Sequence, residues 1–294
     1  MRRLKTMRTA RPTVSLVIPA YNEESHLGAC LEAVAAQTVR PLEVIVVDNN
    51  STDDTANIAR RYPFVTLLRE PRQGVVYARD AGFNAARGDI IGRTDADSIL
   101  APNWVEELQK AFVDPAVEAT SGVVEYRDVG CKKAFDVIDK RFRFFLAGRT
   151  AARHELFLYG VTMGVRRSAW HAVRGDVCHE RHMHEDLDLA AHMSRRRQRV
   201  TFTPNMHASI APRQAASGLK EYNKYVWSGP RVYAEHGLRS QCFMYPMAVF
   251  TSVLYLPIHL LYKGYNPTTR RFSLRYALRA TSAPTRVSPV SDVI

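Results

Sequence analysis

Apolar and polar positions alternate in blocks along the first two hundred residues. Short apolar runs are predicted to be buried strands, namely Val14–Ile18, Val44–Val47, Val65–Leu68 and Ile90–Gly92. Segments with helical periodicity lie between them, at about Glu24–Gln37, in a stretch ending at Arg60, and at Val75–Ala86. Strands that alternate with helices of about 10–15 residues are typical of parallel βαβ units, so the pattern predicts an α/β fold.

The polar turn after the second run predicts the start of a helix. Ser51 or Thr52 is expected to cap the helix that ends at Arg60, because a hydroxyl can satisfy the free amides there. Further elements are predicted as a helix at Trp104–Phe112, strands at Val117–Tyr126 and Phe157–Val165, a helix near Ser168–Val173, a helix from Glu185, and a strand at Val200–Thr203.

Polar side chains follow the predicted strands at the point where each strand ends. Tyr21 and Asn22 follow the first strand, Asp48 follows the second, and Asp95 and Asp97 follow the fourth. Ligands of open α/β sheets bind beyond the carboxyl ends of the strands. We therefore expect these side chains to share one crevice.

The two carboxylates of Asp95-Ala96-Asp97 stand two residues apart after a strand. Mg²⁺ and Mn²⁺ prefer oxygen ligands and often join a protein carboxylate to a diphosphate. A divalent ion there would neutralise charge on a departing nucleoside diphosphate. This spacing also occurs in solvated loops, but the position opposite Asp48 favours the metal interpretation.

Five motifs follow one another along the chain. They are Val-Ile-Pro-Ala-Tyr-Asn-Glu-Glu at 17–24, Val-Val-Asp-Asn-Asn-Ser-Thr-Asp-Asp-Thr at 46–55, Ala-Arg-Asp-Ala-Gly at 78–82, Asp95-Ala96-Asp97 and Glu185-Asp186. Together they resemble the ordered motifs of family 2 glycosyltransferases. The resemblance covers about residues 13–210. It implies the GT-A fold, which is a Rossmann-like mixed sheet flanked by helices, and an inverting transfer from a nucleotide sugar.

The resemblance also implies roles for single residues. Pro19, Tyr21 and Glu23 would surround the base and ribose, Asp48 would bind the base, and Arg79 would approach the nucleotide. Asp95, Ala96 and Asp97 would bind the ribose, the diphosphate and the metal ion. The metal is expected to be Mn²⁺ or Mg²⁺ and the nucleotide to be of the UDP or GDP type. Taken alone, Tyr21 and Arg79 fit packing or a surface contact equally well.

Glu185-Asp186 opens a predicted helix, where two acids also suit the helix dipole. An inverting transfer needs a base opposite the leaving group, and a carboxylate suits that task. The resemblance assigns the base to Asp186, with Glu185 beside it in the catalytic pair.

Histidines gather just before this pair, at His179, His182 and His184. Zinc spacing rules do not fit them cleanly, so an acceptor-side loop is favoured over a second metal site. His207 is a candidate metal ligand, because related GT-A enzymes can complete the metal shell with a histidine about here. A partly buried structural histidine is the alternative.

The net charge of +12 lies entirely in the last hundred residues. Residues 195–294 carry 15 Lys and Arg but only Glu221, Glu235 and Asp292 as acids. This asymmetry indicates an anionic partner, either a membrane or a nucleic acid. The cysteines, which are Cys30, Cys131, Cys178 and Cys242, form no C-x-x-C pair, which argues against a structural zinc site and is consistent with a reducing cytoplasm.

Phe243–Tyr262 carries no formal charge and is long enough for a transmembrane helix. Pro246 and Pro257 interrupt it, and a single crossing would export the basic tail against the positive-inside tendency. We therefore predict a peripheral or re-entrant segment at the cytoplasmic face of an anionic membrane. A helix packed on the catalytic domain is the alternative.

The predicted organisation is a basic tail at 1–12, a catalytic domain at 13–210, a basic and aromatic helical membrane-associating region at 211–280, and a disordered tail at 281–294. The predicted activity transfers one sugar from a nucleotide-diphosphate sugar to a glycan or lipid-linked acceptor of the cell envelope. Processive relatives carry Q-x-x-R-W, and Lys224-Tyr225-Val226-Trp227 lacks its Gln and Arg.

Three alternatives remain. A sugar-1-phosphate nucleotidyltransferase would need a Gly-rich loop after the first strand, where the chain has Pro19-Ala20-Tyr21-Asn22. A non-catalytic nucleotide-sugar-binding partner of a membrane synthase is the second. A basic nucleic-acid-binding protein is the third, but the acidic crevice would repel phosphates, so no nucleic acid is expected among the partners.

Overall fold

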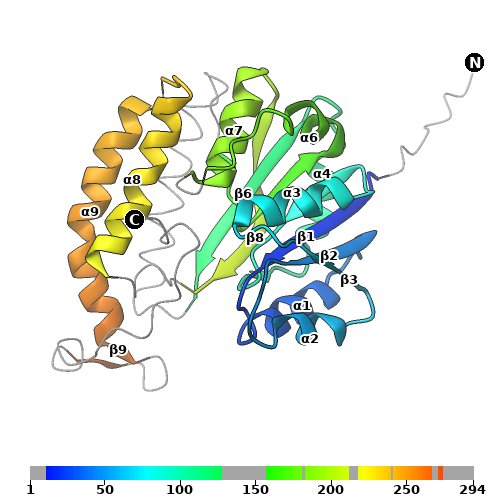
Figure 1. The fold of residues 1–294 in the computed structure, drawn as a ribbon, viewed down its shortest axis with the longest axis horizontal. Coiled ribbons are helices and arrows are strands. Elements are labelled where there is room, and N and C mark those ends of the chain that lie inside the picture. Colours follow the sequence, from blue (N-terminus) through cyan, green and yellow to red (C-terminus); the bar gives the residue numbers. More distant parts are fainter. Residues whose placement is uncertain are drawn as a thin grey trace, which may run out of the picture.

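The computed structural model describes residues 11–127, 157–180, 183–211, 218–239, 241–266 and 271–273. This part of the chain forms one eight-stranded sheet with helices on both faces, followed by a pair of long helices (Figure 1). Most of the predicted tail at 1–12, the whole of the predicted tail at 281–294, and His182 lie outside the described residues.

The large sheet is mixed, with the order β3-β2-β1-β4-β7-β6-β8-β5. Its strands are β1 Val14–Ala20, β2 Glu43–Asp48, β3 Val65–Arg69, β4 Ile90–Arg93, β5 Ile99–Leu100, β6 Ala119–Tyr126, β7 Met163–Arg166 and β8 Val200–Ile210. The first four strands pair in parallel, as the βαβ pattern predicts. β7 runs antiparallel to both β4 and β6, which makes the sheet mixed.

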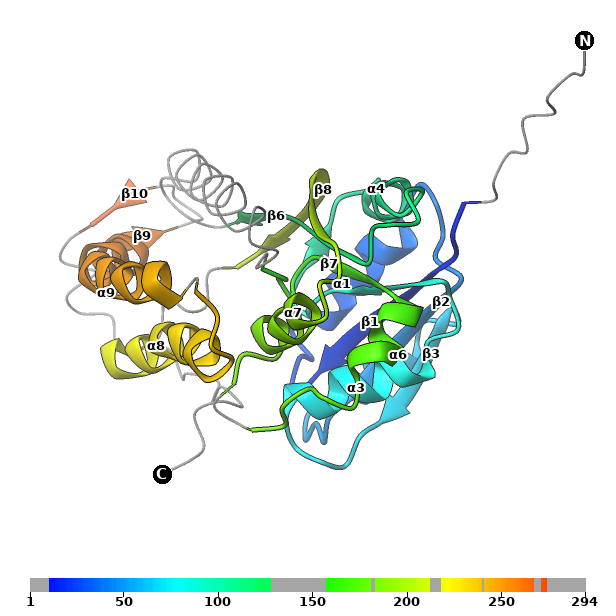
Figure 2. The same ribbon diagram turned by 90° about the horizontal axis from the view of Figure 1, so that it is seen from above.

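Helices cover both faces of this sheet (Figures 1 and 2). One face packs against α1 Leu27–Ala35, α2 Thr55–Arg60 and α4 Trp104–Ala111, and the other against α3 Val75–Ala85, α6 Arg167–Val173 and α7 Glu185–Arg195. Along β1, Leu16 and Ile18 enter the first core and Val17 enters the second. A strand buried on both faces explains why β1 has a continuous apolar sequence.

Some local predictions are wrong, for identifiable reasons. Neither Ser51 nor Thr52 caps α2, whose N-cap residue is Asp54. The Ser51 hydroxyl instead accepts a hydrogen bond from the Asn22 amide (3.1 Å), and the Thr52 amide donates to Asn22 Oδ1 (2.8 Å). These polar groups therefore join two strand-end turns rather than starting a helix.

The acceptor-side strand is also shorter than predicted. Within Phe157–Val165, only Met163 onward belongs to β7, and residues 157–162 approach the sheet without strand pairing. The glycines there serve packing, since a Cβ at Gly164 would lie 2.2 Å from Leu108 Cδ1. β5 was not predicted, because two residues are too few to give a periodic signal.

Beyond the sheet, α8 Leu219–Glu235 packs on α7, and α9 Gln241–Gly264 lies alongside α8 (Figures 1 and 2). α9 continues through Pro246 and Pro257. Among the described residues, no helix combines the length and apolar character needed to cross a membrane. A two-stranded sheet of β9 Tyr265–Asn266 and β10 Arg271–Phe272 follows α9.

Candidate active site

Hydrogen bonds join the turns after β1 and β2, and these bonds position the first site residues. Asn22 and Asn50 adopt positive φ angles of 51° and 62°, which asparagine tolerates better than most residues. The Asn49 amide donates to Ala20 O (2.9 Å), and Asp48 Oδ1 accepts from the Ser51 amide (3.1 Å). Asp48 is thereby held, almost buried, at the carboxyl end of β2.

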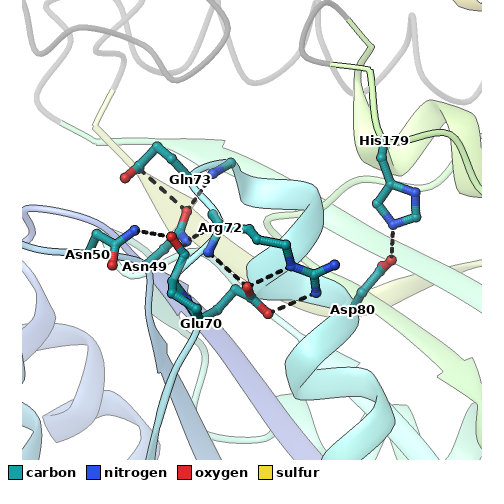
Figure 3. A network of polar contacts seen from close by, with 9 residues as sticks. Asn49, Asn50, Glu70, Arg72, Gln73, Asp80 and His179 are labelled. Carbon is teal, nitrogen blue, oxygen red and sulfur yellow. Dashed lines mark hydrogen bonds and ion pairs between the residues drawn. The ribbon is translucent and has the colours of Figure 1, made fainter.

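A second network connects these turns to the start of α3 (Figure 3). Asn49 donates to Glu70 O (2.9 Å) and Arg72 O (2.7 Å), and its Oδ1 accepts from the Gly74 amide (2.8 Å). Gly74 is the N-cap of α3 and has a φ of 143°, a conformation that favours glycine. Asn49 therefore fixes the direction in which α3 leaves the strand edge.

The centre of the site is Arg93, the last residue of β4. Its Nη2 lies 2.8 Å from Asp95 Oδ1 and 2.9 Å from Glu185 Oε1, and its side chain is only 4% exposed. Gly160 makes room for this guanidinium, because a Cβ there would lie 1.2 Å from Arg93 Nη1. One cation thus joins the end of β4 to the start of α7.

Four predicted acids surround this cation. Burial lowers the pKa of Arg93, but the carboxylates of Asp95, Glu185, Asp186 and Asp97 outweigh burial and raise it. Asp97 and Asp186 therefore act on the same guanidinium and do not lie on opposite sides of the molecule. The two aspartates that follow β4 therefore lie near the two acids that begin α7. The approach of Tyr21 and Asp48 to these acids stays a prediction.

The pKa of the Asp95 carboxyl is raised by burial and by the negative charges near it. Its side chain keeps 36% of its surface exposed, yet surrounding protein raises the pKa of its carboxyl to about 7. Arg93 opposes that rise, and Asp97 adds to it. The carboxylates outnumber the cation, and such an excess of oxygen ligands suits a divalent ion of the Mn²⁺ or Mg²⁺ type.

The adjacent acids Glu185 and Asp186 have opposite environments. Burial alone would raise the pKa of Glu185, but Arg93 and Arg79 outweigh burial and lower it. Burial, followed by repulsion from Glu185, raises the pKa of Asp186. Asp186 Oδ2 accepts from the Gly160 amide (3.0 Å) and Oδ1 from the Leu187 amide (2.8 Å), so its carboxylate is held in a fixed direction.

Arg79 lies inside the protein rather than at its surface. The side chain is fully buried, with Nη2 2.7 Å from Asp80 Oδ1 and with Nη1 donating to the Glu185 carbonyl oxygen. The guanidinium therefore holds the first turn of α7. The nucleotide contact implied by the resemblance stays a prediction for this residue.

The remaining nucleotide candidates lie at the ends of β1 and β4. Cys30 Sγ lies 3.7 Å from Asp95 O, and burial followed by Asp97, Asp95 and Glu23 raises the pKa of the thiol. Glu23 is thus near the two aspartates, and its amide donates to Thr55 Oγ1 (2.7 Å). Pro19 and Tyr21 are half-buried, and Ala96 is buried.

His207 lies on β8, with Nδ1 2.8 Å from Glu125 Oε1 on β6. A carboxylate in this place orients the ring in the manner of many metal-binding histidines, with Nε2 as the ligand atom. Among the described residues, however, Asp95, Asp97 and His207 do not form a compact ligand cluster. An ion held between them would need further ligands, which a diphosphate can supply.

The described histidines of the predicted loop, His179 and His184, do not come together in a metal site of their own. His179 Nε2 lies 2.9 Å from Asp80 Oδ2 (Figure 3). The His179 ring also stacks on Tyr77. His184 Nε2 instead lies 3.0 Å from the Tyr225 carbonyl oxygen on α8. These two histidines bind different elements, so the described residues give no support to a metal site shared between them.

Tyr225 and Arg93 were missed as site residues by the sequence analysis. Tyr225 keeps 39% of its surface exposed, yet surrounding protein and then the Asp186 carboxylate raise the pKa of its hydroxyl. That effect places α8 beside the acids. An arginine ending the apolar run Ile90-Ile91-Gly92 was a visible signal for Arg93, since buried arginines are rare unless paired.

The sequence and the fold are both similar to those of known proteins. The sequence profile described as Glycosyl transferase family 2 matches residues 15–174. The putative glycosyltransferase EpsH of Bacillus subtilis (strain 168) is 30% identical over 124 residues, which cover 40% of this chain and 36% of EpsH. The match therefore spans little more than a third of that relative's length.

Two solved structures share the fold over most of the chain. Mannosyltransferase PcManGT from Pyrobaculum calidifontis, in complex with GDP-Man and Mn²⁺, has a TM-score of 0.61 at 22% identity, covering 92% of this chain and 79% of that chain. Glucosyl-3-phosphoglycerate synthase from Mycobacterium tuberculosis, with Mn²⁺, UDP-glucose and phosphoglyceric acid, has a TM-score of 0.54 at 19% identity, covering 77% and 80%. These similarities confirm the predicted GT-A fold.

The contact between Gly160 and Arg93 gives a test of the site's centre. Gly160→Ala should destabilise the protein by about 1–3 kcal/mol, because the added methyl group overlaps the guanidinium. In an Arg93→Ala background the same change should cost less than about 0.5 kcal/mol, since the space is then free. Urea denaturation of the four proteins in this cycle measures both costs. Equal costs in the two backgrounds would show that the guanidinium does not occupy this position.

Proposed function

Since the chain belongs to glycosyl transferase family 2, we propose that it transfers a single sugar from a nucleotide-diphosphate sugar to an acceptor hydroxyl with inversion at the anomeric carbon. The observation that carries this proposal is the set of four acids around Arg93. Two of these acids follow β4, where a donor diphosphate would bind, and two begin α7.

We assign the general base to Asp186. A carboxylate with a raised pKa is a better proton acceptor than an ordinary aspartate, and Asp186 is half-buried with its direction fixed by two amides. Glu185 was predicted beside it in the catalytic pair, but its carboxylate is engaged by Arg93. Glu185 is therefore assigned a positioning role, as is Arg79, which holds the same helical turn.

Asp95, Asp97 and His207 are the residues that would hold a divalent metal ion. When bound, such an ion supplies positive charge to the leaving diphosphate. Pro19, Tyr21, Glu23 and Asp48 would receive the base and ribose at the ends of β1 and β2. Since one structurally similar protein was solved with GDP-Man and the other with UDP-glucose, a donor of the UDP or GDP type is supported.

The acceptor side of the site is assigned to the region between Asp186 and α8. Tyr225 lies there with its ring in an edge contact to His184, at 4.6 Å between centroids. A glycan or lipid-linked acceptor of the cell envelope is proposed, with one transfer per acceptor, because Lys224-Tyr225-Val226-Trp227 lacks the Gln and Arg of processive relatives.

We also propose that α9 binds an anionic membrane surface at the cytoplasmic face. Val249, Phe250 and Val253 are 49%, 56% and 70% exposed on this helix. Apolar side chains on one helix, next to an excess of basic residues, suit an interfacial position with lipid headgroups around the cations. This surface would bring the site close to a lipid-linked acceptor.

Asp186→Asn should lower kcat by roughly 10²–10⁴ fold, the usual range for loss of a general base. Asp176→Asn is the matched control, because Asp176 forms a surface ion pair with Arg196 outside the site. Circular dichroism should show both variants folded. A kcat near that of the wild type in the Asp186 variant would remove this residue from the mechanism.

Nucleotide sugars should stabilise the protein in the presence of Mn²⁺. A ligand present at one hundred times its Kd should raise Tm by about 5–10 °C, because it binds only the folded state. The rise should be lost in Asp97→Asn. A panel of UDP and GDP sugars measured by differential scanning fluorimetry identifies the donor, and no shift with any member would contradict the proposed function. A shift without turnover would favour the non-catalytic binding partner.

Membrane binding is tested by liposome flotation of the full-length chain. The wild type should float with vesicles that contain anionic lipid. The vesicle-bound fraction of the double variant Phe250→Asp/Val253→Asp should be at least tenfold smaller than that of the wild type. Val113→Asp is the control, since Val113 is 59% exposed on the catalytic domain. Equal flotation of all three proteins, or flotation of none, defeats the proposal.

A further inference from the structure

Four potential metal ligands meet between the loop before α7, α7 itself and the end of α8. They are Cys178, Asp188, His192 and His236, and one ligand atom from each lies within 4.8 Å of all the others. No other group of this kind occurs among the described residues. None of the four belongs to the acidic cluster around Arg93.

The distances in this cluster resemble those between the ligands of one ion. Asp188 Oδ1 lies 3.3 Å from His192 Nε2 and 2.8 Å from His236 Nε2, and Cys178 Sγ lies 3.8 Å from His192 Nε2. Tetrahedral zinc bonds of their usual lengths place neighbouring ligand atoms about 3.3–3.6 Å apart. An ion at the centre would therefore require only small movements of the side chains.

The backbone brings these residues together in a specific way. Asp188 and His192 stand four residues apart on one face of α7, and the Cys178 amide donates to Asp188 Oδ2 (2.9 Å). His236 is the C-cap of α8, followed by Gly237 at a φ of 65°. The Leu238 amide then donates to Tyr233 O (2.9 Å), which closes the helix end and fixes His236.

The charge of the cluster calls for a cation. Asp188 is completely buried, and no Lys or Arg pairs with it in the described part of the chain. Buried carboxylates are normally paired or coordinated to a metal. A thiolate, a carboxylate and two neutral imidazoles would together carry two negative charges, which one divalent ion balances.

We propose that Cys178, Asp188, His192 and His236 form a structural Zn²⁺ site. The sulfur and nitrogen donors favour zinc over Mn²⁺ or Mg²⁺, which prefer oxygen. Four protein ligands leave no open position, as in structural rather than catalytic zinc sites. This inference does not rest on the proposed function, because none of the four residues takes part in it.

The proposed ion would connect three elements, namely the loop before α7, α7 itself and the end of α8. Asp188 lies two residues after Asp186, and His236 ends the helix that carries Tyr225. Zinc would thus fix the axial position of α7 and hold α8 against it. The small apolar cluster of Phe157, Ala191, Tyr233 and Leu238 lies at the same junction and would share that task.

Two other uses of the cluster are less well supported. Burial, and then Asp188, raises the pKa of Cys178 to about 11, so without an ion the thiol keeps its proton and is a poor nucleophile. A plain hydrogen-bonded network would satisfy Asp188 through the two histidines. In that network the Cys178 thiol would act only as a weak hydrogen-bond donor, toward the Asp188 carboxylate and His192 Nε2.

The first test is zinc content. The full-length chain, produced in zinc-supplemented medium and passed through a metal-free desalting column, should retain about one zinc per chain by mass spectrometry. Cys178→Ser and His236→Gln should each retain at least fivefold less. Cys242→Ser, at an exposed cysteine outside the cluster, and Asp97→Asn, at the proposed catalytic metal, should keep the wild-type content.

The second test needs no variant that has to fold without zinc. Chain stripped of metal and titrated with Co²⁺ should develop the visible bands of a tetrahedral ion and a near-ultraviolet thiolate-to-cobalt charge-transfer band. Zn²⁺ should abolish both bands, whereas a tenfold excess of Mg²⁺ should not. Zn²⁺ at one hundred times its Kd should raise the Tm of stripped chain by about 5–10 °C.

These outcomes decide the proposal. Wild-type chain that retains under a tenth of a zinc per molecule, with no tetrahedral cobalt spectrum, would overturn it. Unchanged zinc in Cys178→Ser and His236→Gln would place the ion elsewhere and would also overturn it. Because zinc retention and spectra require no donor or acceptor, failure here leaves the nucleotide-sugar thermal shift unaffected.

Discussion

The whole site depends on one buried guanidinium. Carboxylates from the end of β4 and from the start of α7 approach closely, and without a cation among them their repulsion would be costly in a partly buried place. Arg93 relieves that repulsion at Asp95 and Glu185, and Gly160 leaves the space that its side chain needs. The end of β4 and the start of α7 are thereby joined where donor and acceptor would meet.

The contact of Arg93 with Glu185 also makes the pKa values of the neighbouring acids Glu185 and Asp186 differ. Glu185 faces Arg93 and Arg79, whereas Asp186 faces backbone amides and the charge of Glu185. Pairs of titratable groups whose environments push their pKa values apart often divide a reaction's roles between them. Here the division gives Glu185 a positioning role and leaves Asp186 as the base. α7 carries this pair and Asp188 in its first turn and His192 about one turn after Asp188, so one helix contributes to both sites.

The sequence was sufficient for the parallel half of the sheet, because buried strands such as β1 give apolar runs and asparagine-rich turns mark their ends. The rule for strand ends placed Asp95 and Asp97 directly after β4, where the structure has them. Arg93 was missed although an arginine ends the apolar run, because its burial among the acids is visible only in the fold. The proposed zinc ligands could not be predicted from the sequence for another reason. Cys178, Asp188 and His236 come from separate elements, and only the Asp188–His192 spacing is local, so the absence of C-x-x-C argued against zinc until the fold brought the ligands together.

The central claim is that Arg93 lowers the pKa of Glu185, while the pKa of Asp186, the next residue of α7, is raised. The most direct measurement is a carbon-13 NMR titration of the Glu185 and Asp186 carboxyl carbons, assigned with Glu185→Gln and Asp186→Asn. The account predicts that Glu185 titrates below its ordinary value of 4.5 and that Asp186 titrates above its ordinary value of 3.8. Both groups titrating at their ordinary values, or in the reverse order, would contradict it.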